Sequence, residues 1–380
     1  MIYLDNAATS FPKPPSVTAE QTRCMREYCG NPGRGSHELA LRAAEKIYEC
    51  REEAASLFGS NHPENTVFTM NTTIALNMAI KGLLRRGDHV LLSDMEHNAV
   101  FRPIYRLAKN GEISYDIFPT HVLDTAAKAE IICHEIEKRI TPRTRMLICA
   151  HSSNICSSSL PLKEIGALCR RNRLFFVVDA AQSAGHHSID MQQMAISALC
   201  VPGHKGLFGP QGSGILLFGE GIKAETLFEG GSGYQSLEGN MPEEAPERYE
   251  AGTLPTPAIS GLCEGIRTVK KLGTERIFQH EKLLNAYLQE RLLALPKITV
   301  YTPHLIGSVL LFNVNGISAD QVGNELNENG ICVRAGYHCA ALGHATLGTP
   351  TGGAVRVSPG IYNTFSHMDA LVDAVKRIIQ

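Results

Sequence analysis

Short apolar runs alternate with amphipathic stretches along the first half of the chain. Residues 38–58 place apolar side chains three and four positions apart, and Gly59 follows them, which predicts a helix with a glycine stop. A further helical pattern lies over residues 129–140. Seven apolar runs have strand length, and most are rich in β-branched or aromatic residues; they span 66–69, 89–93, 114–118, 145–150, 174–180, 197–201 and 214–218. Strands separated by helices predict βαβ units and a mostly parallel seven-stranded sheet that is buried on both faces.

The pattern changes after the seventh run. Residues 219–257 are rich in Gly, Glu and Pro without periodicity, so we expect long functional loops there. Two helices are predicted within 261–294, and the last helix begins with Ser366 and Asp369, which have the spacing of a capping box. The remaining strands are predicted at 308–315, 331–334 and 354–358. We therefore expect an α/β protein with a large domain over 15–260 and a smaller α+β domain over 261–380, which the N-terminal segment 1–14 joins.

Composition and charge exclude several classes of protein. The chain has 36 basic and 38 acidic residues, a net charge of −2, which argues against a general nucleic-acid binder with a basic face. No apolar run approaches the roughly 18 residues that a membrane span needs, and the start MIYLDNAATS lacks a secretory signal pattern. Eleven cysteines without any C-x-x-C pair give little support to a metal site or a thioredoxin-type motif, and they predict a reducing cytoplasm.

Polar side chains follow the predicted strands. Ligands of parallel α/β sheets bind beyond the carboxyl ends of the strands, so these side chains are the first candidates for a site. They are Thr72, Thr73, His97, Asn98, Asn154, Asp179, Gln182, His204 and Lys205. The two threonines begin a helical stretch, where they either cap the helix or, with its free N–H groups, bind a phosphate.

An Asp at one strand end and a Lys after the next strand are the two groups that a pyridoxal 5'-phosphate site most needs. The Lys forms a Schiff base, and the Asp keeps the pyridinium nitrogen protonated so that the ring accepts electrons. A GHK motif alone is a weak signal. Here VDAAQSAGH is followed, 26 residues after Asp179, by the Lys of GHK and then by GPQGSG, which is a specific combination. The sequence therefore predicts a site for this cofactor around Asp179 and Lys205.

These motifs resemble the aminotransferase class V family of fold-type-I pyridoxal phosphate enzymes, in particular its cysteine desulfurase and selenocysteine lyase branch. The resemblance covers nearly the whole chain. Its motifs are YLDNAAT (3–9), GRGSH (33–37), TMNTT, DMEHN, SNICS, VDAAQSAGH, GHK, YEAGT (249–253), VRAGYHCA (333–340) and VRVSPGIYNT (355–364).

The resemblance also implies a role for individual residues. Lys205 would form the Schiff base, Asp179 would pair with the ring nitrogen, and His97 would stack on the ring and take part in catalysis. The remaining cofactor contacts would be Asn154 and Gln182 at the ring hydroxyl, Thr72, Thr73 and His204 at the phosphate, and Thr253 at the phosphate of the neighbouring subunit of a homodimer. The substrate-binding candidates are Arg356 for the carboxylate, Arg334 and Asn6.

Cys339 matches the nucleophilic cysteine of the family. It lies 17 residues before Arg356, a spacing similar to that of the branch with a short, ordered cysteine loop. The implied reaction converts L-cysteine to L-alanine and leaves a persulfide on Cys339, from which an unknown acceptor protein or thiol takes the sulfur. Selenocysteine lyase activity, cysteine sulfinate desulfination and a weakly active cofactor-binding scaffold stay open as alternatives.

Two positions depart from the family pattern. Pro202 stands where the family usually has a Ser or Thr that contacts the phosphate, and it offers neither a hydroxyl nor an N–H group. One phosphate hydrogen bond must therefore come from elsewhere or be missing. Cys156 follows Asn154 closely, where the family has no thiol, and it is either a second functional thiol or a buried structural one.

Overall fold

A seven-stranded sheet forms the centre of the computed structural model, which describes residues 1–33, 35–125 and 128–380. The neighbouring strands pair in parallel except around β8, which is antiparallel to both of its neighbours. In order across the sheet, the strands are β2 (Thr66–Thr69), β8 (Gly214–Phe218), β7 (Ala198–Pro202), β6 (Phe175–Asp179), β5 (Thr144–Ala150), β3 (His89–Ser93) and β4 (Ser114–Phe118). The predicted α/β fold with a mostly parallel seven-stranded sheet is confirmed.

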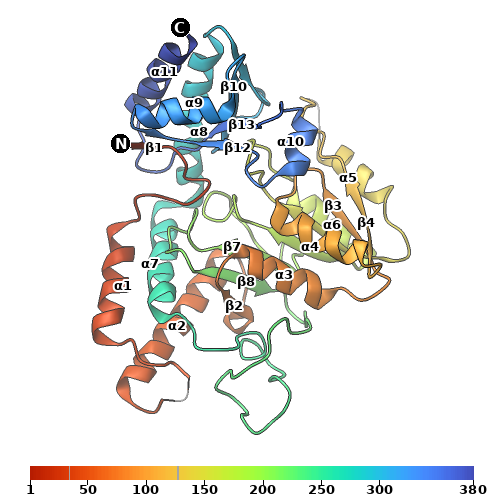
Figure 1. Ribbon diagram of the computed structural model, residues 1–380. Helices are drawn as coiled ribbons and strands as arrows, with labels where there is room; N and C mark the ends of the chain where they lie inside the picture. The colour runs from red at the N-terminus through yellow and green to blue at the C-terminus, as the bar shows by residue number, and fades with distance from the viewer. Residues whose placement is uncertain (34, 126–127) are drawn as a thin grey trace.

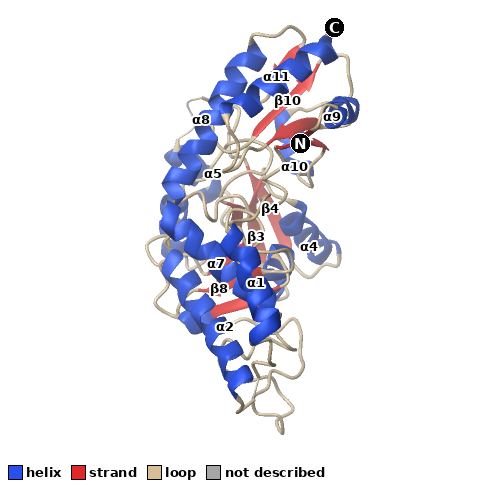
Figure 2. Cartoon of the chain, turned by 90° about the vertical axis from the view of Figure 1, so that its left-hand side faces the viewer, coloured by secondary structure: helices blue, strands red, loops and turns tan. Residues whose placement is uncertain are grey.

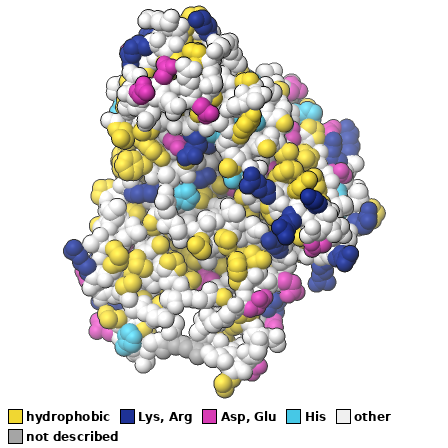
Figure 3. All heavy atoms as spheres, viewed as in Figure 1, with side chains coloured by type: hydrophobic (Ala, Val, Ile, Leu, Met, Phe, Trp, Pro, Cys, Tyr) yellow, Lys and Arg dark blue, Asp and Glu magenta, His cyan; other side chains and the backbone are white. Residues whose placement is uncertain are grey.

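Helices cover both faces of this sheet (Figures 1 and 2). Side chains alternate along each strand, so in β3 Leu91 enters one core while Val90 and Leu92 enter the other. One face is covered by α3 (Thr72–Leu83) and α4 (Asn98–Lys109). The opposite face is covered by α2 (Glu38–Leu57), α5 (Ala129–Glu137), α6 (Leu162–Asn172) and α7 (Thr256–Leu272). Lys and Arg side chains gather over α4 on the surface shown in Figure 3.

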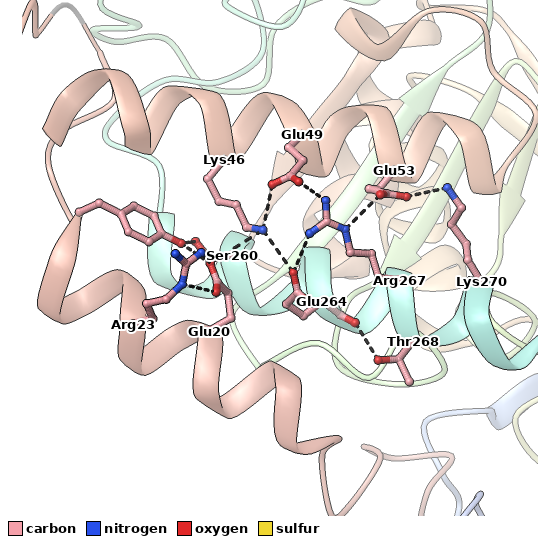
Figure 4. Close-up of polar contacts among 11 residues, drawn as sticks. Glu20, Arg23, Lys46, Glu49, Glu53, Ser260, Glu264, Arg267, Thr268 and Lys270 are labelled. Atoms are coloured by element: carbon pink, nitrogen blue, oxygen red, sulfur yellow. Dashed lines mark hydrogen bonds and ion pairs between the residues drawn. The ribbon is translucent and has the colours of Figure 1, made fainter. Parts of the chain in front are cut away.

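An ionic layer joins the outer helices α2 and α7, with α1 (Pro15–Glu27) beside them (Figure 4). Arg267 of α7 lies among three carboxylates, at 3.1 Å from Glu53 and 2.8 Å from Glu264, and it also pairs with Glu49. Lys46 of α2 contacts Glu49 at 2.9 Å and Glu264 at 3.3 Å. Arg267 and Lys46 therefore each have at least two anionic partners.

The C-terminal part of the chain forms a second core around a four-stranded antiparallel sheet. Its strands, in order, are β12 (Arg334–Gly336), β13 (Ala354–Val357), β10 (Leu310–Val314) and β9 (Ile298–Val300). Its helices are α8 (Thr274–Leu293), α9 (Ala319–Glu328), α10 (Ala341–Leu347) and α11 (Phe365–Ile379). The N-terminal strand β1 (Ile2–Tyr3) pairs with β11 (Ile331–Cys332), so both chain ends lie in this part (Figure 1). A short 3₁₀ helix, η1 (Pro63–Asn65), precedes β2.

Helix starts account for the largest differences from the sequence-based elements. The predicted capping box at Ser366 and Asp369 is wrong, because α11 begins at Phe365 and its N-cap is Thr364. The Thr364 N–H donates to His367 Nδ1 at 3.3 Å, so a histidine takes the place of the expected acidic residue. Likewise, α7 begins at Thr256 rather than near residue 261, with a proline in its first turn. The division into domains at residue 260 falls inside α7 and stays a prediction.

Two further observations concern segments without regular structure and membranes. As expected, residues 219–255 contain no helix or strand between β8 and α7. Within the described ranges, no helix has both the length and the apolar character needed to cross a membrane.

Candidate active site

A pocket lies beyond the carboxyl ends of β5, β6 and β7, where the strand-end residues meet. All predicted cofactor-binding residues except Thr253 line it; they are Thr72, Thr73, His97, Asn154, Asp179, Gln182, His204 and Lys205. Because parallel strands end at one edge of the sheet, residues more than a hundred positions apart come together here. Pro202, the last residue of β7, also lines the pocket.

The amine of Lys205 has no hydrogen bond or ion pair to any residue that the structure describes. Burial, together with the nearby Arg356 guanidinium, lowers the pKa of Lys205 to about 8. About a tenth of the amine is therefore neutral at pH 7, far more than for an ordinary lysine, and only the neutral form is a nucleophile or a base. These properties fit a lysine that bonds an aldehyde.

Asp179 is the last residue of β6 and is almost fully buried. Its Oδ1 accepts a hydrogen bond from the Ala181 N–H at 2.9 Å. Burial raises the pKa of Asp179, because the buried anion has lost hydration. A cationic ring nitrogen beside this carboxylate would offset that cost.

His97 is the N-cap of α4, and its Nδ1 accepts the Ala99 N–H at 3.0 Å. This hydrogen bond assigns the ring proton to Nε2 in the neutral form. Burial and the neighbouring Lys205 and Arg356 cations lower the pKa of His97 to about 4. The ring is therefore neutral at physiological pH and can stack on an aromatic cofactor without placing a second cation beside Lys205.

Two polar atoms of the pocket are buried and lack a partner, Thr72 Oγ1 and His204 Nδ1. Thr72 is the first residue of α3, and Asn71 caps that helix by accepting the Ile74 N–H at 3.0 Å. A phosphate at this helix start would accept hydrogen bonds from both side chains and from free backbone N–H groups. The residues present therefore fit pyridoxal 5'-phosphate, although Pro202 contributes no donor.

The two predicted substrate arginines are joined by a carboxylate that the sequence analysis missed. Arg334 and Arg356 lie opposite each other in the β12–β13 pair, where like charges repel. Asp5 contacts both, at 2.8 Å from Arg356 Nη2 and 3.0 Å from Arg334 Nη2. Arg356 is buried and its Nε has no partner, whereas the Arg334 side chain is 51% exposed. Arg356 is thus the better placed of the two to receive a buried substrate carboxylate.

Cys339 is exposed and lines a groove together with His97. Its carbonyl accepts the Asn98 N–H at 2.7 Å, and the preceding carbonyl of His338 accepts Asn154 Nδ2 at 2.7 Å. His338 and Cys339 both have positive φ angles, 51° and 55°, which non-glycine residues seldom adopt. Residues beside the cofactor pocket therefore hold the cysteine loop in a conformation that its own backbone disfavours.

The neighbouring His338 is not free to exchange protons with Cys339. Its Nε2 faces the Arg334 carbonyl at 3.2 Å, and its Nδ1 lies 3.1 Å from Nε2 of His344. Burial lowers the pKa of His338 to about 3. Both ring nitrogens are occupied, so we assign this histidine to holding the loop.

Cys156 differs from Cys339 in its surroundings. It is 1% exposed and belongs to a small core cluster with Ile155 and Leu311. Burial raises the pKa of the Cys156 thiol, which disfavours the reactive thiolate. This environment supports a structural role for Cys156.

Thr253 and Asn6, like the two arginines and Cys339, lie outside the pocket lining. Thr253 is exposed and lines a different pocket, together with Gly231 and Gly233. Glu250, three residues earlier, accepts a hydrogen bond from Arg51 Nη1 at 2.8 Å. Within one chain, Thr253 is therefore not part of the cofactor pocket. Asn6 lines a small cavity next to Lys205, where its Nδ2 donates to the Ser358 carbonyl at 3.1 Å. Arg34 of the GRGSH motif lies outside the described residues.

A second lysine near the pocket was also missed by sequence reasoning. Lys13 Nζ donates to the His204 carbonyl at 2.7 Å and to Ser10 Oγ at 2.8 Å. Burial lowers the pKa of Lys13 to about 8. Unlike Lys205, this amine is tied to two acceptors, so its pairing distinguishes the two lysines.

Comparisons with known proteins agree with this arrangement. The sequence profile of the family described as aminotransferase class-V matches residues 2–371. A probable cysteine desulfurase from Methanothermobacter thermautotrophicus is 34% identical, over 99% of this chain and 94% of the relative. A cysteine desulfurase from Salmonella agona is 33% identical, over 100% of this chain and 93% of the relative. The solved structure of a cysteine desulfurase from Thermococcus onnurineus NA1 superposes with a TM-score of 0.88 at 30% identity, covering 100% of this chain and 94% of that one. The chain belongs to the aminotransferase class-V family.

Proposed function

We propose that this protein is a pyridoxal 5'-phosphate-dependent cysteine desulfurase, which converts L-cysteine to L-alanine and leaves a persulfide on Cys339. The observation that carries the proposal is one arrangement: a half-buried, unpaired Lys205 and a buried Asp179 share a pocket whose His97 also lines the groove of the exposed Cys339. The full-length relatives named cysteine desulfurase support L-cysteine as the substrate.

Bound pyridoxal phosphate would supply an electron sink for the carbanion that forms at the substrate Cα. Lys205 would bond its aldehyde, Asp179 would hold its ring nitrogen, and the α3 start with Thr72 would hold its phosphate. Arg356 would pair with the substrate carboxylate and so fix the Cα–H bond relative to Lys205. Once displaced by the substrate amine, Lys205 Nζ would take the Cα proton, a role that suits a pKa of about 8.

Cys339 would act as a thiolate on the substrate sulfur. Its Sγ forms a new S–S bond while the substrate Cβ–S bond breaks, and the electron pair of the broken bond passes to the carbon fragment, which becomes alanine after protonation. The exposed position of Cys339 lets an acceptor thiol reach the product persulfide afterwards. Cys156 is buried and cannot take this role without a rearrangement of its core cluster.

The proposal includes a homodimer and a reducing cytoplasm. Thr253 is exposed away from its own pocket, as expected of a residue that serves the phosphate site of a second copy. We expect Thr253→Ala to weaken cofactor retention, and we expect size-exclusion chromatography of the holoenzyme to give a dimer. A monomer that keeps the cofactor and full activity would contradict this part. All eleven cysteines are free, as suits a reducing compartment.

The direct test is alanine release from L-cysteine, L-selenocysteine and L-cysteine sulfinate, measured side by side with and without dithiothreitol. We expect turnover of L-cysteine that dithiothreitol increases, because the reductant removes sulfur from Cys339. A yellow protein that releases no alanine from any of the three substrates would instead be a cofactor-binding scaffold.

A further inference from the structure

We propose that the groove between α3 and α4 is the docking site of the sulfur acceptor, and that the acceptor is a protein whose thiol lies in an acidic segment. This inference rests on the proposed function, because it assigns the partner of the Cys339 persulfide. The groove is lined by Lys81 of α3, by Arg102 and Arg106 of α4, and by His97 and Cys339 at the start of α4.

The charges of the groove are strongly one-sided. Its only acidic lining residue in the part of the chain described here is Glu112, which accepts a hydrogen bond from Asn110 Nδ2 at 3.0 Å. Lys81, Arg102 and Arg106 make no ion pair with any described residue. Figure 3 shows Lys and Arg side chains gathered over α4, although the whole chain has a net charge of −2. A basic groove on a slightly acidic protein attracts anionic partners locally.

The stability of helix α4 does not explain why these cations lie together. Arg102 and Arg106 lie four residues apart on one face of α4, where like charges destabilise a helix. Cations in the last turn of a helix are favourable, but Arg102 lies in the middle of α4. An anionic partner in the groove would remove this repulsion.

The size of the groove favours a peptide segment over a small thiol. The α4 helix has 12 residues and is about 18 Å long, and the groove lining follows it from His97 to Asn110. That length matches about five extended residues of a bound chain. Pro103 and Leu107 add apolar surface to the groove lining. A cysteine with carboxylates on the same segment would place its sulfur at Cys339 and its charges along α4.

The transfer step balances without a further reagent. The acceptor thiol loses its proton to solvent, and its thiolate attacks the outer sulfur of the persulfide. A new S–S bond forms on the acceptor while the bond between the outer sulfur and Cys339 Sγ breaks. Cys339 leaves as a thiolate with the electron pair of that bond, ready for the next substrate.

The test compares thiol probes of different charge on the cysteine-loaded holoenzyme. The probes are Ac-EEGCGEE-NH₂, Ac-QQGCGQQ-NH₂, Ac-KKGCGKK-NH₂ and mercaptosuccinate, and the readout is the second-order rate constant of sulfur transfer. We expect the acidic peptide to react at least about tenfold faster than the basic one at low salt, and the difference to shrink in 0.5 M NaCl. Equal rates for the peptides would overturn the proposal. A mercaptosuccinate rate equal to that of the acidic peptide would also overturn it, in favour of a small acidic thiol.

Matched charge reversals localise the effect. Lys81→Glu with Arg106→Glu should abolish the preference for the acidic peptide, whereas Lys163→Glu with Lys271→Glu should leave it unchanged. The control lysines are exposed on α6 and α7, which cover the opposite face of the sheet. Alanine release with excess dithiothreitol should be the same in all three proteins, because no altered residue belongs to the catalytic pocket. A preference that persists in the groove variant would overturn the proposal.

A binding measurement separates this proposal from the proposed function. Fluorescein-labelled Ac-EEGSGEE-NH₂ cannot accept sulfur, so its affinity for the holoenzyme is independent of turnover. Fluorescence anisotropy should give about tenfold weaker binding to the groove variant than to the wild type and the control. Absence of alanine release with intact peptide binding would reject the desulfurase and keep the acidic-peptide site. Alanine release without peptide binding would do the reverse.

Discussion

The ionic layer between α2 and α7 and the cofactor pocket differ in whether their cations have anionic partners. Arg267 in the layer contacts Glu49, Glu53 and Glu264. Lys205 in the pocket contacts no anion or hydrogen-bond acceptor among the described residues. The layer satisfies its charges internally and so stabilises the packing of helices, whereas the pocket leaves its polar groups free for molecules that are not part of the chain.

The unpaired polar atoms in and near the pocket indicate which kind of ligand the site binds. Thr72 Oγ1 and His204 Nδ1 in the pocket and Arg356 Nε near it are buried without a partner among the described residues, and the Lys205 amine is also unpaired. Leaving buried polar groups unsatisfied costs free energy, so such a concentration is typical of a site whose ligand completes it. The missing partner must present acceptors, as an aldehyde, a phosphate and a carboxylate do.

Replacing the unpaired lysine should have the largest effect. Lys205→Ala should lower alanine release by at least about 10³-fold, because both the covalent link to the cofactor and the Cα base are lost. Borohydride reduction followed by peptide mapping should place the cofactor on Lys205 in the wild type and leave the Lys13 peptide unlabelled. Label on the Lys13 peptide would show that pairing with Ser10 and His204 does not keep that lysine inactive.

Arg334 and Arg356 both contact Asp5, so they allow a comparison within the site between an exposed and a buried cation. Arg356→Lys should lower kcat/KM for L-cysteine by about 10²-fold, because a buried bidentate contact to the substrate carboxylate is lost. Arg334→Lys should cost less than about fivefold, since its exposed side chain pairs with Asp5 in high dielectric. Steady-state kinetics of both variants test the assignment. Equal losses would mean that the pair acts as one unit through Asp5.

The low pKa of Lys205 predicts the pH dependence of cofactor uptake. The neutral fraction of an amine with a pKa of about 8 rises about tenfold between pH 7 and pH 9. The rate at which apoenzyme forms the covalent complex should rise by the same factor, after correction with N-acetyl-lysine for the titration of the cofactor itself. The folded-state pKa lies below the ordinary lysine value, so the folded protein binds fewer protons and this group makes stability rise from pH 8 toward pH 10.5. A midpoint of uptake near 10.5 would contradict the unpaired, buried environment.

The smallest effect is expected in the ionic layer. Arg267→Ala should lower the free energy of unfolding by about 1 kcal/mol, because its side chain is 36% exposed and water screens each pair. Alanine release by the folded variant should stay unchanged. Urea denaturation and steady-state kinetics on the same preparation check both statements, and a loss of activity without loss of stability would show that this layer does not serve packing alone.

Regular periodicity and strand ends made much of this molecule predictable from sequence. The seven runs of the large sheet match its strands to within one or two residues, because buried parallel strands are continuous apolar segments between turns. Asp179 and Lys205 could be placed in one site because parallel strands share one carboxyl edge. Their chemical roles are still predictions, which the variants above address.

Contacts between distant segments could not be predicted in this way. Asp5 meets Arg356 across 351 positions of sequence, and no local pattern indicates that pairing. The exposure of Cys339 and the burial of Cys156 likewise depend on the cores around them, because both lie in short polar loops of similar composition. The N-cap of α11 was misplaced because Thr364 and Ser366 have the same capping chemistry and only the backbone distinguishes them.

In the proposed reaction Cys339 receives the sulfur, and a matched pair of cysteine variants tests this role. Cys339→Ser and Cys156→Ser holoenzymes are given L-cysteine, and alanine release and intact-protein mass are recorded together. We predict that Cys156→Ser keeps turnover and gains about 32 Da as a persulfide, the mass of one sulfur atom, whereas Cys339→Ser keeps its cofactor but loses both alanine release and the mass shift. Retention of most cysteine activity in Cys339→Ser, with loss in Cys156→Ser, would contradict the account and move the persulfide to the Asn154 loop.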